Sequence, residues 1–191
     1  MYIALEGIDT AGKSTQMQEL KKLYPTAIFT KEPGGTELGV KIRELVLFDD
    51  VQSPTTELFL FLADRAEHIQ RVIKPNLSGT IISDRSVVSG LAYALIQKNF
   101  EPERLVSLNL FATDNTLPNH IIILKLTKEE LEYRLSQKEH DKIEARGSDY
   151  LLSIQDALIE ACELLELKYS VIDATLSIEE ITQSIQSSLK A

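Results

Sequence analysis

The sequence predicts an α/β fold, with a largely parallel sheet of about five strands and helices on both of its faces. Short apolar, β-capable segments alternate with helix-like segments along the whole chain. The chain contains no repeat, low-complexity linker or shift in composition, and its 191 residues suffice for one sizeable core. We therefore expect a single domain over residues 1–191.

The N-terminal segment predicts a strand, a phosphate-binding loop and a helix, in that order. Residues 2–5 are apolar, and the helix-tolerant residues 15–23 end at a Tyr24-Pro25 pair, where proline disfavours further helix. Between them, residues 7–14 read GIDTAGKS and fit G-x-x-x-x-G-K-[ST] at every fixed position. Such a loop directs backbone N–H groups and the positive end of a helix at phosphate oxygens. The chain is therefore expected to bind a nucleoside triphosphate, and a ligand-free glycine turn is the alternative.

The fixed residues of the loop each serve this chemistry. Gly7 and Gly12 permit positive φ angles and a close approach of the backbone to an anion. Lys13 supplies a cation for the β- and γ-phosphates, and the Ser14 hydroxyl is a ligand for Mg2+. The candidate triphosphate-binding residues are Gly7, Ile8, Asp9, Thr10, Ala11, Gly12, Lys13, Ser14 and Thr15.

A second strand and a helix come next. Residues 27–30, which read AIFT, predict a short strand, and residues 31–36, which read KEPGGT, form a dense turn signal. Thr36 can cap a helix that runs to about Phe48. The predicted apolar face of this helix comprises Leu38, Ile42, Leu45 and Val46.

A longer helix is predicted from Pro54, with Ser53 as its N-cap, to a point before Pro75. Its first half is apolar almost all round, so more than one surface must cover it. A core helix that also contacts a partner subunit would explain this pattern. A dimer is therefore one hypothesis for this chain.

Residues 80–84 predict a buried strand whose last residue, Asp84, is acidic. In P-loop proteins an aspartate at this place orders the Mg2+ ion. Arg85 follows at once, and an Asp-Arg pair at a strand end lies where open α/β sheets bind ligands. An ordinary strand-end aspartate is the alternative interpretation of Asp84.

The remaining elements continue the alternation of helices and strands. A capping box of Thr127 and Glu130 opens one helix, and Asp149 can cap another. Residues 136–147 are polar and charged, which by itself indicates a solvated loop or a fraying helix. The expected helices cover residues 87–98, 103–113, 128–138, 150–167 and the chain from 177 on, and the expected strands cover 121–126 and 168–172.

The composition argues against several classes of function. The net charge of −9 argues against a broad nucleic-acid surface and against binding to an anionic membrane. The apolar runs are too short to cross a bilayer, and no targeting segment is visible. The one cysteine, Cys162, excludes an intrachain disulfide and lies among apolar residues, as a buried structural thiol does. This cysteine usage fits a reducing cytoplasm.

The phosphate-binding loop alone does not identify the reaction. A switch GTPase would carry an Asn-Lys-x-Asp signature, which the sequence lacks, and a motor or transporter ATPase would need a longer chain. A small-molecule kinase needs a second binding region with its own cations, because a charged acceptor must be brought towards ATP. Arg43, Arg65 and Arg85 are candidates for these cations.

Several segments resemble the thymidylate kinase family, and the likeness covers essentially the whole chain. The most discriminating ones contain EPGGT at 32–36 and ADRA at 63–66. The others are EGIDTAGKST at 6–15, SDR at 83–85, DKIE at 141–144 and IDAT at 172–175. The resemblance implies the three-layer P-loop nucleoside monophosphate kinase fold. It also implies transfer of the γ-phosphoryl group of ATP to dTMP, giving dTDP and ADP for dTTP synthesis, with Mg2+ and in a cytoplasmic homodimer.

The resemblance further implies roles for single residues. Asp9 would accept a hydrogen bond from the deoxyribose 3′-hydroxyl, and Arg85 would clamp the acceptor phosphate. Phe61 would stack on thymine, although it could be a core residue alone. Arg65 lies on the same helical face and would donate to a thymine carbonyl. Tyr93 would lie against the sugar and exclude a 2′-hydroxyl. The implied substrate-binding residues are Asp9, Pro33, Arg43, Phe61, Arg65, Arg85, Ser89 and Tyr93, and the implied metal ligands are Ser14 and Asp84.

The catalytic cation is one departure from the family pattern. Some members carry arginine where Thr10 stands, so the cation here must come from a lid over about residues 136–148. Lys142 is the candidate, with Lys138 and Arg146 nearby, and lysine lacks the planar fork of arginine. The implied catalytic residues are thus Lys13, Asp9, Arg85 and Lys142.

Ala94 is a second departure, because many bacterial members have a glutamine there that contacts the base. Its absence predicts looser discrimination between dTMP and dUMP. Two alternatives to a thymidylate kinase stay open: a kinase for another nucleoside monophosphate or small acceptor, and a non-catalytic P-loop nucleotide-binding regulator. Phosphoryl transfer here needs no histidine, so His68, His120 and His140 are interpreted as surface or helix residues.

Overall fold

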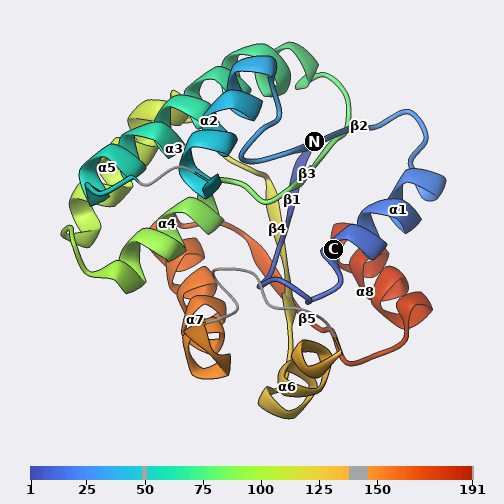
Figure 1. Cartoon of the computed structure of the whole chain (residues 1–191). Helices are drawn as coiled ribbons and strands as arrows, with labels where there is room; N and C mark the ends of the chain where they lie inside the picture. Colours follow the sequence, from blue (N-terminus) through green and yellow to red (C-terminus); the bar gives the residue numbers. More distant parts are fainter. Residues whose placement is uncertain (49–50, 138–145, 191) are drawn as a thin grey trace.

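The computed structural model describes residues 1–48, 51–137 and 146–190. A five-stranded sheet with the strand order β2-β3-β1-β4-β5 runs through the molecule, and every pairing in it is parallel (Figure 1). The predicted fold class is therefore confirmed. The strands are β1 (Tyr2–Glu6), β2 (Ile28–Lys31), β3 (Ile81–Asp84), β4 (His120–Lys125) and β5 (Tyr169–Asp173).

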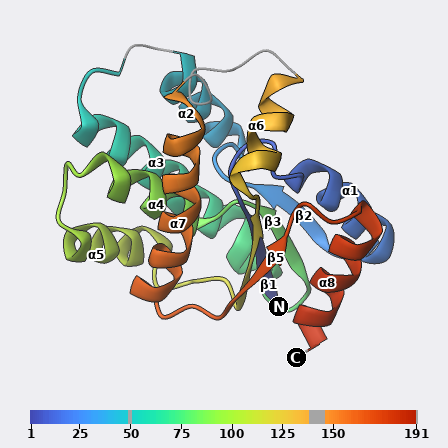
Figure 2. The same cartoon turned by 90° about the horizontal axis from the view of Figure 1, so that it is seen from below.

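Helices cover both faces of the sheet, as Figures 1 and 2 show from two directions. On one face lie α1 (Lys13–Leu23) and α8 (Ile178–Lys190), which contact each other. On the other lie α3 (Pro54–His68), α4 (Val87–Gln97), α5 (Pro102–Thr113) and α7 (Ser148–Leu164). The two further helices are α2 (Glu37–Phe48) and α6 (Lys128–Ser136).

The central strand β1 is buried along its whole length, which explains why its sequence is apolar up to Leu5. Ile3 and Leu5 belong to the core under α1 and α8, whereas Ala4 belongs to the core under α4 and α7. Successive side chains of a strand point to opposite faces, so one short segment contributes to both cores. No helix in the described part of the chain is long and apolar enough to span a membrane.

The order of the strands determines where a ligand can bind. Because β1 lies between β3 and β4, the chain leaves β1 to one side first and returns to its other side later. In open α/β sheets such a switch point forms a crevice at the carboxyl ends of the strands. Leu5 of β1 and Lys31 of β2 are both in register with Asp84 of β3. The segments that follow these three strands therefore lie side by side.

Most predicted helix boundaries agree with the structure to within two residues, and two caps form as expected. Ser53 Oγ accepts a hydrogen bond from the N–H of Thr56 at 3.3 Å, and Thr127 Oγ1 accepts one from the N–H of Glu130 at 3.2 Å. The α-helix α3 ends at His68, before Pro75, as predicted, but the chain stays helical beyond it. A π-helical turn, η1 (Ile69–Ile73), and a 3-10 turn, η2 (Lys74–Asn76), extend it through the proline, which is tolerated in the first turn of a helix because no N–H is needed there.

Asp149 is not the N-cap of α7, so that prediction is wrong. The helix begins at Ser148 after Gly147, whose φ angle of 94° favours glycine. The Asp149 carboxylate accepts a hydrogen bond from Lys128 Nζ at 2.7 Å, an ion pair between two helices that single-sequence capping rules do not foresee.

The predicted apolar face of α2 is also only partly correct. Ile42 is buried, but Leu38 and Leu45 are exposed. The helix packs chiefly against α3 and not against the sheet. Contact with one neighbouring helix buries a narrower stripe than contact with a sheet does. Cys162, in contrast, is buried as predicted, and burial raises the pKa of its thiol to about 12.

Gln155 tests how much a buried side chain stabilises the fold by hydrogen-bonding to backbone groups. Its buried side chain accepts a hydrogen bond from the N–H of Leu126 at 2.8 Å and donates one to the carbonyl of Leu126 at 2.9 Å. Gln155→Ala leaves both backbone groups without these partners, so we expect the free energy of unfolding to fall by about 2–4 kcal/mol in urea titrations. The exposed Gln183→Ala should change it by less than about 0.5 kcal/mol. Equal effects of the two substitutions would contradict this account.

Candidate functional site

The loop between β1 and α1 surrounds a cavity of about 550 Å³, which we call the loop cavity. Six of the nine predicted triphosphate-binding residues line it, and the other three lie behind it. Ile8 and Ala11 are buried, and the carbonyls of Gly7 and Ile8 face Lys13. The lining residues are Asp9, Thr10, Gly12, Lys13, Ser14, Thr15, Lys31, Glu32, Arg43, Asp84 and Arg85.

Backbone geometry explains the two glycines of the loop. Gly12 precedes α1 with a φ angle of 94°. A Cβ atom on Gly7 would lie 3.0 Å from the carbonyl oxygen of Leu124, so any other residue would push the loop away from β4. Thr10 also has a left-handed φ angle, 69°, which is rare for a β-branched residue. Strain of this kind is concentrated at functional sites.

Lys13 lies across the loop. Its Nζ donates to the carbonyls of Gly7 at 2.8 Å and Ile8 at 3.0 Å, and lies 3.9 Å from Asp9 Oδ1. Burial, together with the charge of Arg85, lowers the pKa of Lys13 to about 8. A triphosphate would offset both causes, because its negative charge favours the protonated amine.

Asp84 and Ser14 line the loop cavity, as expected for metal ligands. Asp84 Oδ1 is buried and has no hydrogen-bond partner among the described residues, which is unusual for a carboxylate oxygen. A carboxylate and a hydroxyl are hard oxygen donors of the kind that Mg2+ prefers. The described residues contain no group of three or more His, Cys, Asp or Glu that could hold a metal. Mg2+ fits a sparse site, because it keeps several of its own waters.

A second cavity, of about 410 Å³, lies among α2, α3, α4 and α7, and we call it the helix cavity. All eight predicted substrate-binding residues line it: Asp9, Pro33, Arg43, Phe61, Arg65, Arg85, Ser89 and Tyr93. Phe61 is half-buried at its wall and so is not a core residue alone. Ala94 also lines it.

Arg85 lies at the junction of the two cavities, together with Asp9, Glu32 and Arg43. Its Nη2 donates to Asp9 Oδ1 at 2.7 Å, and its Nη1 donates to Ser89 Oγ at 3.0 Å and to the carbonyl of Gly7 at 3.2 Å. Burial acts to lower the pKa of Arg85, but the charges of Asp9 and the other carboxylates near it outweigh burial and hold the pKa above its usual value. The guanidinium is thus a permanent cation between the loop and α4.

Glu6 is a buried residue next to the site that the sequence reasoning missed. It is fully buried, and its carboxylate accepts hydrogen bonds from Ser86 Oγ at 2.7 Å and Ser89 Oγ at 2.5 Å. Burial raises the pKa of Glu6, although both hydroxyls and Arg85 act to lower it. This network anchors the first turn of α4 to the end of β1. The one available signal was an acidic residue at the end of an otherwise apolar strand.

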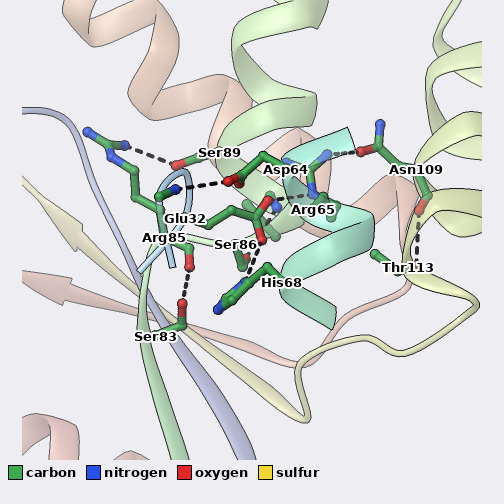
Figure 3. Close-up of polar contacts among 12 residues, drawn as sticks. Glu32, Asp64, Arg65, His68, Ser83, Arg85, Ser86, Ser89, Asn109 and Thr113 are labelled. Atoms are coloured by element: carbon green, nitrogen blue, oxygen red, sulfur yellow. Dashed lines mark hydrogen bonds and ion pairs between the residues drawn. The ribbon is translucent and has the colours of Figure 1, made fainter. Parts of the chain in front are cut away.

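A second buried network surrounds Arg65 on α3 (Figure 3). Arg65 Nε donates to Glu32 Oε1 at 2.5 Å, and its Nη1 donates to Asn109 Oδ1 on α5. The other Glu32 oxygen lies 3.4 Å from His68 Nδ1. Burial acts to raise the pKa of Glu32, but Arg65 and His68 lower it overall, so the carboxylate stays charged.

The interpretation of the histidines as surface or helix residues is confirmed for one histidine and wrong for another. His68 belongs to α3 but is completely buried, and its Nε2 lies 2.7 Å from Thr30 Oγ1. His120 is a buried strand residue whose Nε2 lies 2.9 Å from Ser170 Oγ. Both bind a hydroxyl from a neighbouring strand, a contact that no local pattern reveals. His140 lies outside the described residues.

Tyr93 lies near Arg85, whose guanidinium carbon is 5.9 Å from the centre of the phenol ring. Burial raises the pKa of Tyr93 to about 12, although Arg85 acts against the shift. The side chain therefore enters the helix cavity as a neutral phenol. Its place beside Arg85 is consistent with a contact to the part of a ligand next to its phosphate.

Of the three candidate cations of the predicted lid, only Arg146 lies within the described residues. Lys138 and Lys142 lie outside the described residues. Arg146 lines the helix cavity, and its guanidinium packs 4.9 Å from the ring centre of Tyr150. Arg134, which the sequence reasoning missed, donates to the carbonyl of Thr10 at 2.9 Å and thereby supports the loop.

Known proteins are similar to this chain over nearly its whole length. The family model described as thymidylate kinase matches residues 5–185. A thymidylate kinase of Aliarcobacter butzleri is 57% identical over 186 residues, with 97% of each chain covered. One of Sulfurimonas denitrificans is 60% identical over 185 residues, again with 97% of each chain covered. One of Campylobacter jejuni is 48% identical over 191 residues, with 100% of this chain and 98% of the relative covered. The chain therefore belongs to the thymidylate kinase family.

Proposed function

We propose that the two cavities divide the substrates between them, with the triphosphate of ATP in the loop cavity and dTMP in the helix cavity. The reaction transfers the γ-phosphoryl group of ATP to dTMP and gives dTDP and ADP. An oxygen of the dTMP phosphate attacks the γ-phosphorus, and the bond to the bridging oxygen of ADP breaks. The observation that carries this assignment is that Asp9 and Arg85 line both cavities at their junction.

On the donor side, the backbone of the loop and Lys13 bind the phosphates. Lys13 exchanges its carbonyl partners for phosphate oxygens, which need a cation more than a carbonyl does. Ser14 and Asp84 would hold Mg2+, which when bound neutralises charge on the β- and γ-phosphates. The unpartnered Asp84 oxygen supports this assignment.

On the acceptor side, Arg85 holds the dTMP phosphate near the loop. Its described contacts use three guanidinium N–H groups, so others remain for phosphate oxygens. Asp9 accepts from the 3′-hydroxyl, Phe61 stacks on the base, Arg65 donates to a thymine carbonyl and Tyr93 excludes a 2′-hydroxyl. Pro33, Arg43 and Ser89 complete the wall. No strong base is required, because the acceptor phosphate is already an anion.

The chain acts as one P-loop kinase domain over residues 1–191, with a lid at about 136–148. Its role is the supply of dTDP for dTTP synthesis, and its compartment is the cytoplasm. The single buried cysteine supports a reducing compartment.

A panel of monophosphates tests the substrate assignment. In a coupled assay of ADP release, kcat/KM for dTMP should exceed that for AMP, CMP and GMP by about a hundredfold or more. With alanine at position 94, dUMP should be only about tenfold poorer than dTMP, the low end for loss of one methyl group. A preference for AMP, CMP or GMP would identify a different monophosphate kinase. A much larger penalty for dUMP would refute the loose base selectivity.

The catalytic cation of the lid is Lys142 in this proposal. Lys142→Ala should lower kcat about tenfold or more with little change in the KM for dTMP, because the cation acts only on the transferring group. Lys13→Ala should abolish activity, and Lys138→Ala is the matched control within the lid. The assignment fails if kcat of the Lys142 variant equals that of the unmodified enzyme.

The enzyme acts as a homodimer through the outer surface of α3 and α5. Phe59 on α3 is 56% exposed and Phe111 on α5 is 86% exposed, and these two helices pack together. Two large exposed aromatics on neighbouring helices fit a subunit contact.

Light scattering should give a mass near twice the 21.4 kDa of the chain. Phe59→Glu should shift this mass towards the monomer, whereas Tyr133→Glu should not, although Tyr133 on α6 is 62% exposed. A monodisperse monomer of the unmodified chain would refute the dimer.

A further inference from the structure

Asn109 contacts the proposed base-binding arginine from outside the helix cavity (Figure 3). It belongs to α5, which contributes no residue to either cavity, and it is only 1% exposed. Its Oδ1 accepts a hydrogen bond from Arg65 Nη1. Burying the amide of Asn109 beside a buried arginine removes both polar groups from water, which costs free energy unless the contact between them compensates.

The amide of Asn109 is held in one orientation. Its Nδ2 donates to the carbonyl of Leu105 at 2.7 Å, one turn earlier in the helix. The amide nitrogen is therefore occupied, and the oxygen faces Arg65. Thr113 Oγ1 donates to the backbone carbonyl of Asn109 at 3.0 Å and therefore does not contact this amide. The acceptor that Arg65 contacts is thus fixed by α5 itself.

The contacts of Arg65 leave one edge of the guanidinium for the cavity. Glu32 accepts from Nε and Asn109 accepts from Nη1. The third nitrogen, Nη2, lies against Gly90 of α4, where a Cβ atom would come closer than atoms can approach. Arg65, Gly90 and Phe61 all line the helix cavity.

We infer that Asn109 is a positioning residue that sets the base selectivity of the enzyme through Arg65. Glu32 balances the charge of the guanidinium, and Asn109 fixes its direction without adding a second negative charge. The fixed N–H group can donate a hydrogen bond to a base with a carbonyl at its far edge, such as thymine. It disfavours a base with an amino group there, such as cytosine, because two donors would then face each other. The inference rests on the proposed contact between Arg65 and the base.

The test compares near-isosteric variants at position 109. Asn109→Leu removes the acceptor at similar volume, so the KM for dTMP should rise about tenfold while kcat changes less than about twofold. The ratio of kcat/KM for dTMP to that for dCMP should fall about tenfold. Asn109→Asp restores an acceptor for Arg65 Nη1, so its KM should stay within about threefold of the unmodified enzyme.

Thr113→Val is the matched control, because Thr113 is equally buried on α5 but donates only to carbonyls of its own helix. It should leave KM and the selectivity ratio unchanged, and thermal unfolding of each variant separates loss of fold from loss of positioning. If Asn109→Leu does not fold, Gly90→Ala displaces the same guanidinium from its other edge and should reproduce the rise in KM.

Arg65→Lys separates the inference from the proposed function. If it raises the KM while the folded Asn109→Leu, or Gly90→Ala in its place, keeps the KM and selectivity of the unmodified enzyme, the role of Asn109 is refuted and the base contact stands. If Arg65→Lys also changes neither quantity, the proposed contact of Arg65 with the base is refuted as well.

Discussion

The ion pair between Arg85 and Asp9 is the interaction on which the arrangement of the site depends. It joins the residue that follows β3 to the loop that follows β1, at the place where both cavities meet. A partly buried guanidinium is stabilised by partners for its donors, so Asp9, Ser89 and the carbonyl of Gly7 determine where it lies. The left-handed φ angle of 67° at Arg85 is maintained against its cost by these contacts.

The same design appears twice in the molecule. A buried glutamate, Glu6 or Glu32, lies at or just after the end of a strand, and each supports an arginine that faces the helix cavity. Glu32 contacts Arg65 directly, whereas Glu6 acts through Ser89 on Arg85. Parallel strands bring these residues together because their carboxyl ends share one edge of the sheet. The fold thus brings basic groups together locally in a chain whose net charge is −9.

Part of the lining of both cavities followed from the family resemblance, whereas the sheet and the phosphate-binding loop followed from the residues themselves. These features depend on local order, since a strand, a glycine loop and a helix are adjacent in the chain. The cap at Asp149, the apolar face of α2 and the burial of His68 could not be predicted in the same way. Each depends on a partner far along the chain, such as Lys128 for Asp149. The support of Arg65 by Asn109, 44 residues away, is the clearest case.

The central claim is that donor and acceptor bind at the same time on either side of Arg85. A dinucleotide with adenosine and thymidine joined by five phosphates tests it directly, because one molecule would fill both cavities. In calorimetry we expect one such molecule per chain, with a dissociation constant about a hundredfold or more below those of ATP and dTMP alone. Binding no tighter than the better single nucleotide, or two molecules per chain, would contradict a shared junction.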